Sequence, residues 1–343
     1  MNSKFLGFLI ALGSLTSLTG LPVRAADAPK ASEPRKIRWV LAHEPVDVFR
    51  RAAGAFSERL SKSSGGKLQV EILTVSEYAD KYGGGTFRQE DVIAWVSDGR
   101  IEMSQSYVSD LGRYNKDMLA LELPYLFKNH DHARKVLEGQ VGDQLLAGLS
   151  KGNLKGLAFT YSGGYRILPA TKAVKKVEDF KGLRIRTSYN PVAMDTLRSL
   201  GAEPVPMSLN DVPQAFKAGK IDAAESTYVR FYAMKQNQPG TVLNDTQHSL
   251  FLTSIILNKT FWNSLTPAEQ DLVREAAQVA ARTERQESID DVAVTRGRCE
   301  KEGIQVVDFP ESEKAKIRQA TAPLLLKYEK RFSPGLISKL QEE

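Results

Sequence analysis

The sequence predicts an α/β fold with two lobes and one long helix that spans both. Three observations support this prediction. The length of 343 residues suits about two domains. Strand-like and helix-like segments alternate along the chain, and residues 266–303 hold no proline or glycine between Pro267 and Gly297. A helix of roughly 30 residues is about 45 Å long, which exceeds one small domain.

The alternation begins after a proline- and alanine-rich segment. Residues 36–42 (KIRWVLA) read as a strand, and the next segment carries apolar residues such as Val48, Phe56 and Leu60 at helical spacing. Gly65 and Gly66 end that helix, and residues 67–73 form the next strand. A strand, a helix and a strand in succession predict a parallel pair with a right-handed crossover.

The same reading continues to the long helix. Further strands are expected at 101–107, 154–164, 164–170, 182–188 and 202–207, near 223–228, and within 248–265. Further helices are expected at 88–100, 130–152, 191–201 and 209–222. At the long helix, Thr266 is the expected N-cap, Pro267 suits the first turn, and Glu269 completes a capping box. We place the first lobe at 36–160 plus about 250–290, and the second at 161–249 plus about 291–343.

The first 25 residues read as a signal peptide, and residues 26–35 read as a flexible leader. The most apolar part, residues 5–12, is far shorter than the roughly 20 residues needed to span a bilayer. Cleavage is expected after about Ala25. Cys299 is the single cysteine, so the sequence offers neither an intrachain disulfide nor a lipid-modified N-terminal cysteine. These features predict an exported protein of the bacterial periplasm.

Catalytic and cofactor motifs are missing from the sequence. There is no GxGxxG after a strand, no GxxxxGK[ST], no HExxH and no GxSxG. The spacing of His130 and His132 does not place both rings on one helix face, so we expect a solvated helix start there and not a metal site. The formal charge of +6 is spread along the chain, which argues against nucleic acid as a partner. Glu44 and Glu225 lie near strand ends, where they are candidates for polar contacts.

The most informative segment is FKGLRIRTSYNP, residues 180–191. Arg184 and Arg186 point to the same face if this segment is a strand. Arg166 lies in a second strand-like segment, GGYRILPA. Guanidinium groups recognise carboxylates by two parallel hydrogen bonds, so either an anion or open water is expected beside these side chains.

Six segments together are similar to one known family. They are FSERLSKSSGGKLQVEI, LELPYLFKNHDHARKVLEG, GYRIL, EDFKGLRIRT, LGAEPVPMSLNDVPQAFKAGKIDAAES and LNKTFWNSLTPAEQDLVREAA. Over about residues 37–332 the chain resembles the extracytoplasmic solute receptors of tripartite ATP-independent periplasmic (TRAP) transporters, the DctP-like family. The resemblance implies a two-lobed periplasmic binding protein with a ligand cleft between the lobes. It implies that the protein is not an enzyme, that it needs no cofactor and that its ligand is a small carboxylate. Its other partners would be a membrane permease with a small four-helix and a large multi-span subunit, and we expect a monomer.

The resemblance also assigns roles to individual residues. Arg186 stands where the family forms its main salt bridge to the ligand carboxylate, and Arg166 stands where a second arginine often assists. Arg184 is expected to be structural or solvent-facing. Glu225 is retained, but Ser226 stands where the family commonly has asparagine. A serine still offers one shorter hydrogen bond.

Other positions bear on which acid is bound. Sialic-acid receptors of the family have a phenylalanine near the position of Leu209. Near the positions of Arg88 and Tyr107 they have acidic residues that bind the sugar hydroxyls. This chain lacks both features, so sialic acid is disfavoured as its ligand. Arg88 is a candidate for a second acidic group, whereas Tyr107, Tyr161 and Tyr228 suit an aromatic or apolar acid. These alternatives stay open, as do a receptor that feeds a sensor and an exported enzyme that acts on a small acid.

Overall fold

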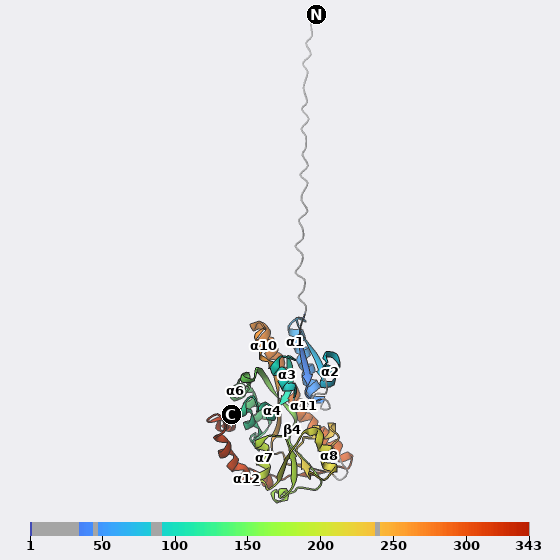
Figure 1. Ribbon diagram of the computed structural model, residues 1–343, viewed down its shortest axis with the longest axis vertical. Coiled ribbons are helices and arrows are strands. Elements are labelled where there is room, and N and C mark those ends of the chain that lie inside the picture. Colours follow the sequence, from blue (N-terminus) through green and yellow to red (C-terminus); the bar gives the residue numbers. More distant parts are fainter. Residues whose placement is uncertain (2–33, 44–46, 84–90, 237–240, 343) are drawn as a thin grey trace. The chain divides into compact units, whose positions relative to one another are not determined.

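The computed structural model describes residues 1, 34–43, 47–83, 91–236 and 241–342. Residues 34–343 form one compact unit. The expected signal peptide and nearly all of the leader lie outside the described residues. Within the unit, helices surround two separate β-sheets, which confirms the expected two-lobed α/β fold (Figure 1).

The sheet of the first lobe has five strands in the order β2-β1-β3-β10-β4. Their bounds are Arg35–Leu41 for β1, Leu68–Thr74 for β2, Met103–Tyr107 for β3, Leu154–Tyr165 for β4 and Leu250–Asn258 for β10. β1 pairs in parallel with β2 and β3, as the strand-helix-strand pattern predicts. β10 runs antiparallel between β3 and β4, so the sheet is mixed. Trp39 and Val40 are both fully buried and belong to different apolar clusters, because successive strand residues face opposite sides.

The sheet of the second lobe has six strands in the order β11-β9-β5-β8-β6-β7. Their bounds are Leu168–Ala170 for β5, Arg184–Thr187 for β6, Glu203–Pro206 for β7, Ala223–Ala224 for β8, Val242–Asp245 for β9 and Gln305–Asp308 for β11. β6 lies between β7 and β8 and is parallel to both. The chain crosses between the two sheets after β4 and again before β10, so residues 166–167 and 246–249 lie at the connection of the lobes.

The helices fill the segments between strands. The helices before β10 are α1 (Asp47–Ser63), α2 (Val75–Tyr82), α3 (Val92–Asp98), α4 (Val108–Leu111), α5 (His130–Glu138), α6 (Gln140–Gly148), α7 (Pro191–Ser199), α8 (Val212–Lys217) and α9 (Tyr228–Ala233). Those after it are α10 (Lys259–Asn263), α11 (Pro267–Lys301), α12 (Glu311–Glu329) and α13 (Leu336–Glu342). Short 3₁₀ turns are η2 (Lys116–Glu122), η3 (Leu149–Gly152), η4 (Val177–Phe180) and η5 (Leu209–Asp211). The single helix expected at 130–152 is two helices, because Gly139 is extended between α5 and α6.

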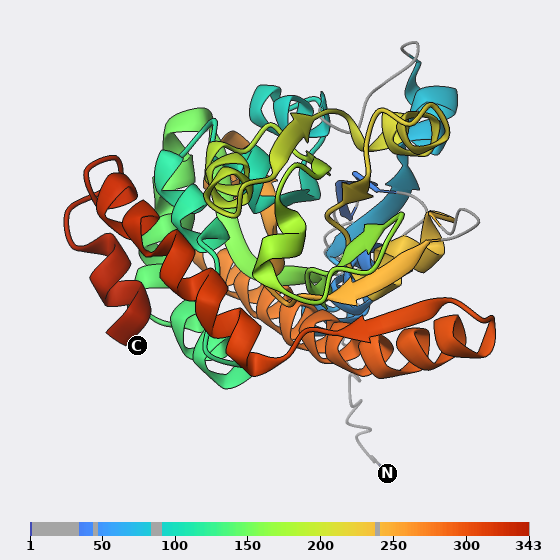
Figure 2. The same cartoon turned by 90° about the horizontal axis from the view of Figure 1, so that it is seen from below.

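Helix α11 is the long helix that the sequence predicts. It begins with the expected capping box, in which Thr266 and Glu269 exchange backbone hydrogen bonds, and Pro267 occupies its first turn. The helix packs against α1 and β4 of the first lobe and against α9 and β11 of the second, and it runs beneath both in Figure 2. It therefore connects the lobes, as expected.

The C-terminal helices contact both lobes: α12 packs against α7 and η4 of the second lobe, and its Ile317 lies in the apolar cluster of Leu168 and Ile185. Leu324, Tyr328 and Leu340 belong to the same apolar cluster as Val40 and Phe159 of the first sheet. The assignment of 291–343 to the second lobe, made from the sequence, stays a prediction. Among the described residues, no helix combines the length and apolar character needed to cross a membrane.

Candidate functional site

The strand order of the second sheet brings the predicted site residues together. Arg186 on β6 is aligned with Ala224 on β8, and the Glu225 N–H donates to the Arg186 carbonyl at 3.1 Å. On the other side of β8, Ser226 forms a β-bridge with Ile167. Arg166, Glu225 and Arg186 therefore lie at adjacent strand ends, where ligands of open α/β sheets are usually found.

Arg186 is the most unusual of these residues. Its side chain is buried, with 8% of the residue exposed, and its Nε and Nη2 donate to the Met207 carbonyl at 3.2 and 2.8 Å. No carboxylate of a described residue lies within ion-pair distance of it. Burial, together with the charge of Arg230, lowers the pKa of Arg186 to about 10. A buried cation without a counter-ion is unfavourable, and an anionic ligand would compensate it.

Arg184, two residues earlier, differs from Arg186 in both exposure and ion pairing. Its side chain is 39% exposed and forms an ion pair with Asp222, with Nη2 and Oδ1 2.7 Å apart. The backbone N–H of Arg184 donates to the same carboxylate at 2.9 Å. The expectation that Arg184 is a structural or solvent-facing residue is confirmed.

Arg166 is buried but compensated. Its Nη1 donates to Glu122 Oε2 and to Ser249 Oγ, both at 2.8 Å. Its guanidinium carbon lies 4.0 Å from the ring centroid of Phe251. Burial by itself would lower the pKa of Arg166, but the charges of Glu122 and Glu225 outweigh burial and raise it. Arg166 therefore carries its own counter-ion, unlike Arg186.

Glu225 is held ionised by its neighbours. His248 Nε2 lies 3.0 Å from Glu225 Oε1, and the Thr187 hydroxyl donates to Glu225 Oε2. Burial would raise the pKa of Glu225, but the hydrogen bond from His248 and the charge of Arg166 lower it to about 2. The described contacts of this carboxylate are thus to the protein itself.

A third buried arginine, Arg230, joins the site and was not predicted from the sequence. It lies in the first turn of α9 and is 2% exposed. Its Nη1 donates to the Tyr107 hydroxyl at 2.6 Å, and its Nε has no hydrogen-bond partner among the described residues. Burial and the charge of Arg166 lower the pKa of Arg230 despite the opposing effect of the Tyr107 hydroxyl.

The site gathers three buried guanidinium groups, those of Arg166, Arg186 and Arg230. The charge of Glu225 favours the protonated forms of Arg166 and Arg186, and the charge of the partly buried Asp110 favours that of Arg230. No described carboxylate forms an ion pair with Arg186, whose hydrogen bonds go to a backbone carbonyl. Such an arrangement attracts an anion, because burial weakens the screening of charges by water.

The remaining predicted residues lie in different surroundings. Tyr107 lies at the arginine cluster, where its ring stacks on Phe251 with centroids 5.1 Å apart. Ser226 is fully buried, and its hydroxyl donates to Gln236 Oε1 at 2.9 Å. Leu209 belongs to a small apolar cluster of the second lobe. Glu44 and Arg88 lie outside the described residues.

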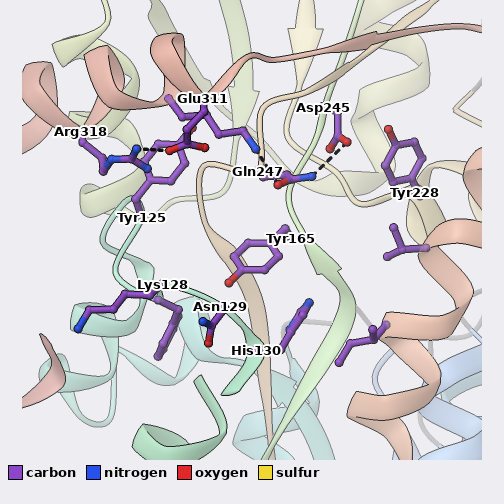
Figure 3. A pocket seen from close by; sticks show the side chains of 14 residues that line it. Tyr125, Lys128, Asn129, His130, Tyr165, Tyr228, Asp245, Gln247, Glu311 and Arg318 are labelled. Carbon is purple, nitrogen blue, oxygen red and sulfur yellow. Dashed lines mark hydrogen bonds and ion pairs between the residues drawn. The ribbon is translucent and has the colours of Figure 1, made fainter. Parts of the chain in front are cut away.

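Tyr228 lies on a cavity at the connection of the lobes. This cavity has a volume of about 640 Å³ and is lined by residues of both lobes and of α11 and α12. Figure 3 shows Tyr165 in the middle of the cavity, between the segment of Asn129 and His130 on one side and Gln247 on the other. In the described part of the chain, the hydroxyls of Tyr165 and Tyr228 have no hydrogen-bond partner, and burial raises the pKa of both.

The arginine cluster, not this cavity, is the better candidate for an anion site. The cationic residues of the cavity are largely engaged with polar neighbours: Arg318 donates to Glu311, and Lys314 donates to Gln247 at 2.8 Å. The expectation of a solvated helix start at His130 is only half right. The helix α5 does begin there, but His132 is 7% exposed.

No metal centre is visible in the part of the chain that the structure describes, where no three His, Cys, Asp or Glu side chains come together. The single cysteine, Cys299, is buried, and burial raises the pKa of its thiol.

Sequence reasoning missed residues that approach the site from a distance in the chain. Arg230 lies three residues after the strand end AAEST (223–227), so a search for charged residues in the first turn of the next helix would have found it. Glu122 and His248 had no comparable signal. They reach Arg166 and Glu225 from 44 and 23 residues away, and only the folded chain places them there.

The chain is similar in sequence to a known family of proteins. A sequence model of bacterial extracellular solute-binding proteins, family 7 (DctP), matches residues 42–331. The chain is 27% identical over 75% of its length to the C4-dicarboxylate-binding periplasmic protein DctP of Rhodobacter capsulatus, and it covers 74% of that protein. It is 29% identical to an uncharacterized protein of Haemophilus influenzae, over 76% of this chain and 77% of that one.

Solved structures of TRAP periplasmic solute-binding proteins have the same fold. The structure from Bradyrhizobium sp. in complex with galacturonate has a TM-score of 0.80 and 29% identity, over 90% of this chain and 100% of that one. The structure from Polaromonas sp. bound to D-erythronate has a TM-score of 0.79 and 26% identity, over 90% and 98%. Because the family model spans most of the 343 residues, this chain belongs to the DctP family (family 7) of bacterial extracellular solute-binding proteins.

Proposed function

We propose that this protein captures a small organic acid in the periplasm and delivers it to the membrane permease of a TRAP transporter. Arg186 binds the carboxylate of that acid. The observation that carries the proposal is the buried guanidinium of Arg186, which has only the Met207 carbonyl as a described hydrogen-bond partner. A carboxylate is the ligand that matches a guanidinium in both charge and geometry.

The surrounding residues favour binding over catalysis. Glu225 is engaged by Thr187 and His248, and Arg166 by Glu122, so these groups orient the site. The solved relatives from Polaromonas and Bradyrhizobium hold D-erythronate and galacturonate, which are both monocarboxylic acids with hydroxyl groups. This similarity supports an organic acid as the ligand class.

Ligand capture would close the two lobes by a hinge motion. The site draws Arg186 from the second lobe and Tyr107 from the first, so a ligand held between them stabilises the closed arrangement. The connecting segments at 166–167 and 246–249, together with α11, are where the motion would occur.

A thermal-shift screen of organic acids tests the proposal. At a concentration about 100 times its Kd, a bound acid stabilises the folded state by about 2.7 kcal/mol, which raises the Tm by roughly 5 °C. Arg186→Ala should weaken binding of that acid by more than about 100-fold and abolish the shift.

Arg184→Ala is the matched control, because it removes an arginine two residues away that is already paired with Asp222. It should leave the affinity unchanged. If Arg186→Ala binds the acid as tightly as the wild type, Arg186 is not the anchor.

Two other functions remain distinguishable by experiment. A receptor that feeds a sensor would have the same binding site, so deletion of the permease genes decides between them: transport requires the permease and signalling does not. An exported enzyme would convert the acid during incubation, which mass spectrometry of the recovered ligand would detect.

A further inference from the structure

The cavity of about 640 Å³ at the connection of the lobes, here called the hinge cavity, lies opposite the arginine cluster. Tyr165 lines this cavity, whereas the next residue, Arg166, belongs to the cluster. In the second connecting segment Gln247 lines the cavity, whereas the ring of His248 contacts Glu225 at the cluster. Each connecting segment therefore has the cluster on one side and the hinge cavity on the other.

The walls of the hinge cavity come from both lobes and from the long helix. Phe127 and Tyr165 belong to the first lobe, and Gln247 belongs to the second. Ile289 and Val292 are three residues apart on α11, so they share one face of that helix. The volume is within the range of small-molecule sites, which commonly measure about 300–1,000 Å³. Figure 3 shows Tyr165 in the middle of the cavity.

The walls combine aromatic rings with polar atoms that lack protein partners. The hydroxyls of Tyr165 and Tyr228 and the Nδ1 of His130 have no hydrogen-bond partner among the described residues. Burial raises the pKa of both tyrosines, so their hydroxyls keep the proton and are able to donate. A buried donor without a partner costs free energy, and a ligand with a hydrogen-bond acceptor would satisfy it.

The charged groups of the hinge cavity already have partners in the protein. Arg318 donates to Glu311, and Asp245 pairs with an arginine of α11 at 3.1 Å. Lys314 and Lys128 donate to neutral oxygen atoms, at 2.8 and 3.3 Å. The walls therefore favour an uncharged ligand with apolar surface over an ion.

Lobe motion would change the size of the hinge cavity. Arg186 is 8% exposed and Arg230 is 2% exposed, so the lobes lie close together on the side of the arginine cluster. A rotation about the connecting segments that opens the cluster to solvent brings the walls on the opposite side together. A molecule in the hinge cavity would oppose that rotation and thereby hold the lobes closed.

We infer that the hinge cavity is a second binding site, which takes a small uncharged molecule with a ring and a hydrogen-bond acceptor. Its occupancy favours the closed lobes and therefore strengthens binding of the organic acid. The effect on the acid rests on the proposed function, whereas the site itself does not.

Benzamide, acetophenone and benzyl alcohol are suitable probes, because each joins one ring to an acceptor oxygen. Ligand-observed NMR titrations should give a Kd of about 1 mM or tighter for at least one of them, as expected for molecules of this size. Val292→Trp fills the cavity and should weaken that probe by at least about 10-fold. Tyr165→Phe removes one hydroxyl and should weaken it by about 3- to 10-fold.

Val294→Trp is the matched control. Val294 lies on the same helix, but 63% of it is exposed, so the same substitution there should leave the Kd of the probe unchanged. If Val292→Trp does not fold, Ile289→Phe fills the cavity from the preceding turn of α11 and should give the same loss.

The effect on lobe closure is measured with the organic acid that the thermal-shift screen identifies. A saturating probe should lower the Kd of that acid by about 5-fold or more in isothermal titration calorimetry, a coupling typical of linked sites. Val292→Trp should lower the Kd of the acid without any probe, because the added ring takes the place of the bound molecule.

Four results separate the parts of the inference. If no probe binds, or if Val292→Trp and Val294→Trp lose the probe equally, the hinge cavity is not the site. If Arg186→Ala, whose arginine cluster is impaired, binds benzoate more tightly than benzamide, the ligand class is wrong. An unchanged Kd of the acid in the presence of the probe overturns the effect on closure. If no organic acid binds, the proposed function fails, and the probe titrations still decide whether the site exists.

Discussion

At the scale of single residues, the site is defined by which buried charges have partners. Arg166 pairs with Glu122, and Glu225 pairs with His248. Among the described residues, no carboxylate forms an ion pair with Arg186 or Arg230. Compensated charges contribute to the stability of the fold, whereas uncompensated charges cost stability until a ligand arrives. This contrast separates residues that build the site from residues that bind.

Glu225→Gln should reduce stability in a pH-dependent way. The folded pKa of Glu225 is about 2, below its ordinary value of 4.5, so its carboxylate stabilises the fold above pH 4.5. That contribution, about 3 kcal/mol at most, is lost as the pH falls from 4.5 toward 2. Urea unfolding at pH 7 and pH 3 should show a large difference between variant and wild type at pH 7 and a smaller one at pH 3. An equal difference at both values would contradict the role of the ionised carboxylate.

The two arginines of the LRIR segment illustrate what sequence could predict at this scale. Strand periodicity placed Arg184 and Arg186 on one face and could not separate them. The resemblance to the family separated them correctly as to exposure: Arg184 is paired at the surface and Arg186 is buried. Arg230 joins the buried arginines Arg166 and Arg186 because α9 packs against the first lobe. No local sequence pattern predicts that packing.

At the scale of elements, α9 links the lobes. Its N-cap is Thr227, whose side chain accepts from the Arg230 N–H and donates to the Ser162 carbonyl of β4 at 2.9 Å. The same short helix directs Tyr228 to the cavity and Arg230 to the arginine cluster. The close approach of β4 to this cap requires glycine at position 163, where an added Cβ would lie 2.5 Å from Thr227 Oγ1.

Gly163→Ala should therefore destabilise the fold and weaken ligand binding. Gly163 and Gly164 both have φ of +85°, so alanine at either position costs about 1 kcal/mol of backbone strain. At Gly164 the nearest atom to the added Cβ is Val292 Cγ2, at 3.4 Å, so Gly164→Ala is the matched control. Only Gly163→Ala should lose roughly a further 1–3 kcal/mol in chemical unfolding and shift the Kd. If both variants lose the same stability and affinity, the contact of Gly163 with the N-cap of α9 does not contribute to either.

The sequence predicted most helices and strands correctly, and the errors have local causes. Residues 130–152 read as one helix, since one glycine is tolerated in a helical pattern, but Gly139 adopts an extended conformation and divides it. The segment 164–170 read as one strand, whereas β5 covers only its last three residues, because Arg166 and Ile167 cross between the lobes.

At the scale of the whole molecule, α11 joins the two lobes and carries a buried acid. Glu284 is fully buried in the middle of this helix, and its Oε2 accepts the Tyr161 N–H of β4 at 2.7 Å. Its Oε1 has no hydrogen-bond partner within the ranges that the structure describes. Burial raises the pKa of Glu284 well above its ordinary value, so this carboxyl group holds its proton more strongly in the folded chain than in the unfolded chain.

Glu284→Gln should stabilise the protein at high pH. Because the folded pKa is raised, the wild type loses stability as the pH rises above 4.5, and glutamine avoids that loss while it still accepts the Tyr161 N–H. We expect a gain of about 1–3 kcal/mol at pH 8 that disappears near pH 4, measured by chemical unfolding.

Glu275→Gln on the same helix is the control. Glu275 is exposed and paired with Arg59, so its loss should change stability by less than about 1 kcal/mol at either pH. A gain for Glu284→Gln that does not vary with pH would show that ionisation is not its cause.

The sequence by itself determined the α/β class, the bounds of α11 with its capping box, and Arg186 as the residue to test. Hydrophobic periodicity, caps and glycine turns are local signals, and a family resemblance adds positions along the chain. Only the tertiary structure decided which charges meet. Glu122, His248 and Arg230 reach the site from separate segments. Their contacts with Arg166, Glu225 and Tyr107 exist only after these segments have packed together.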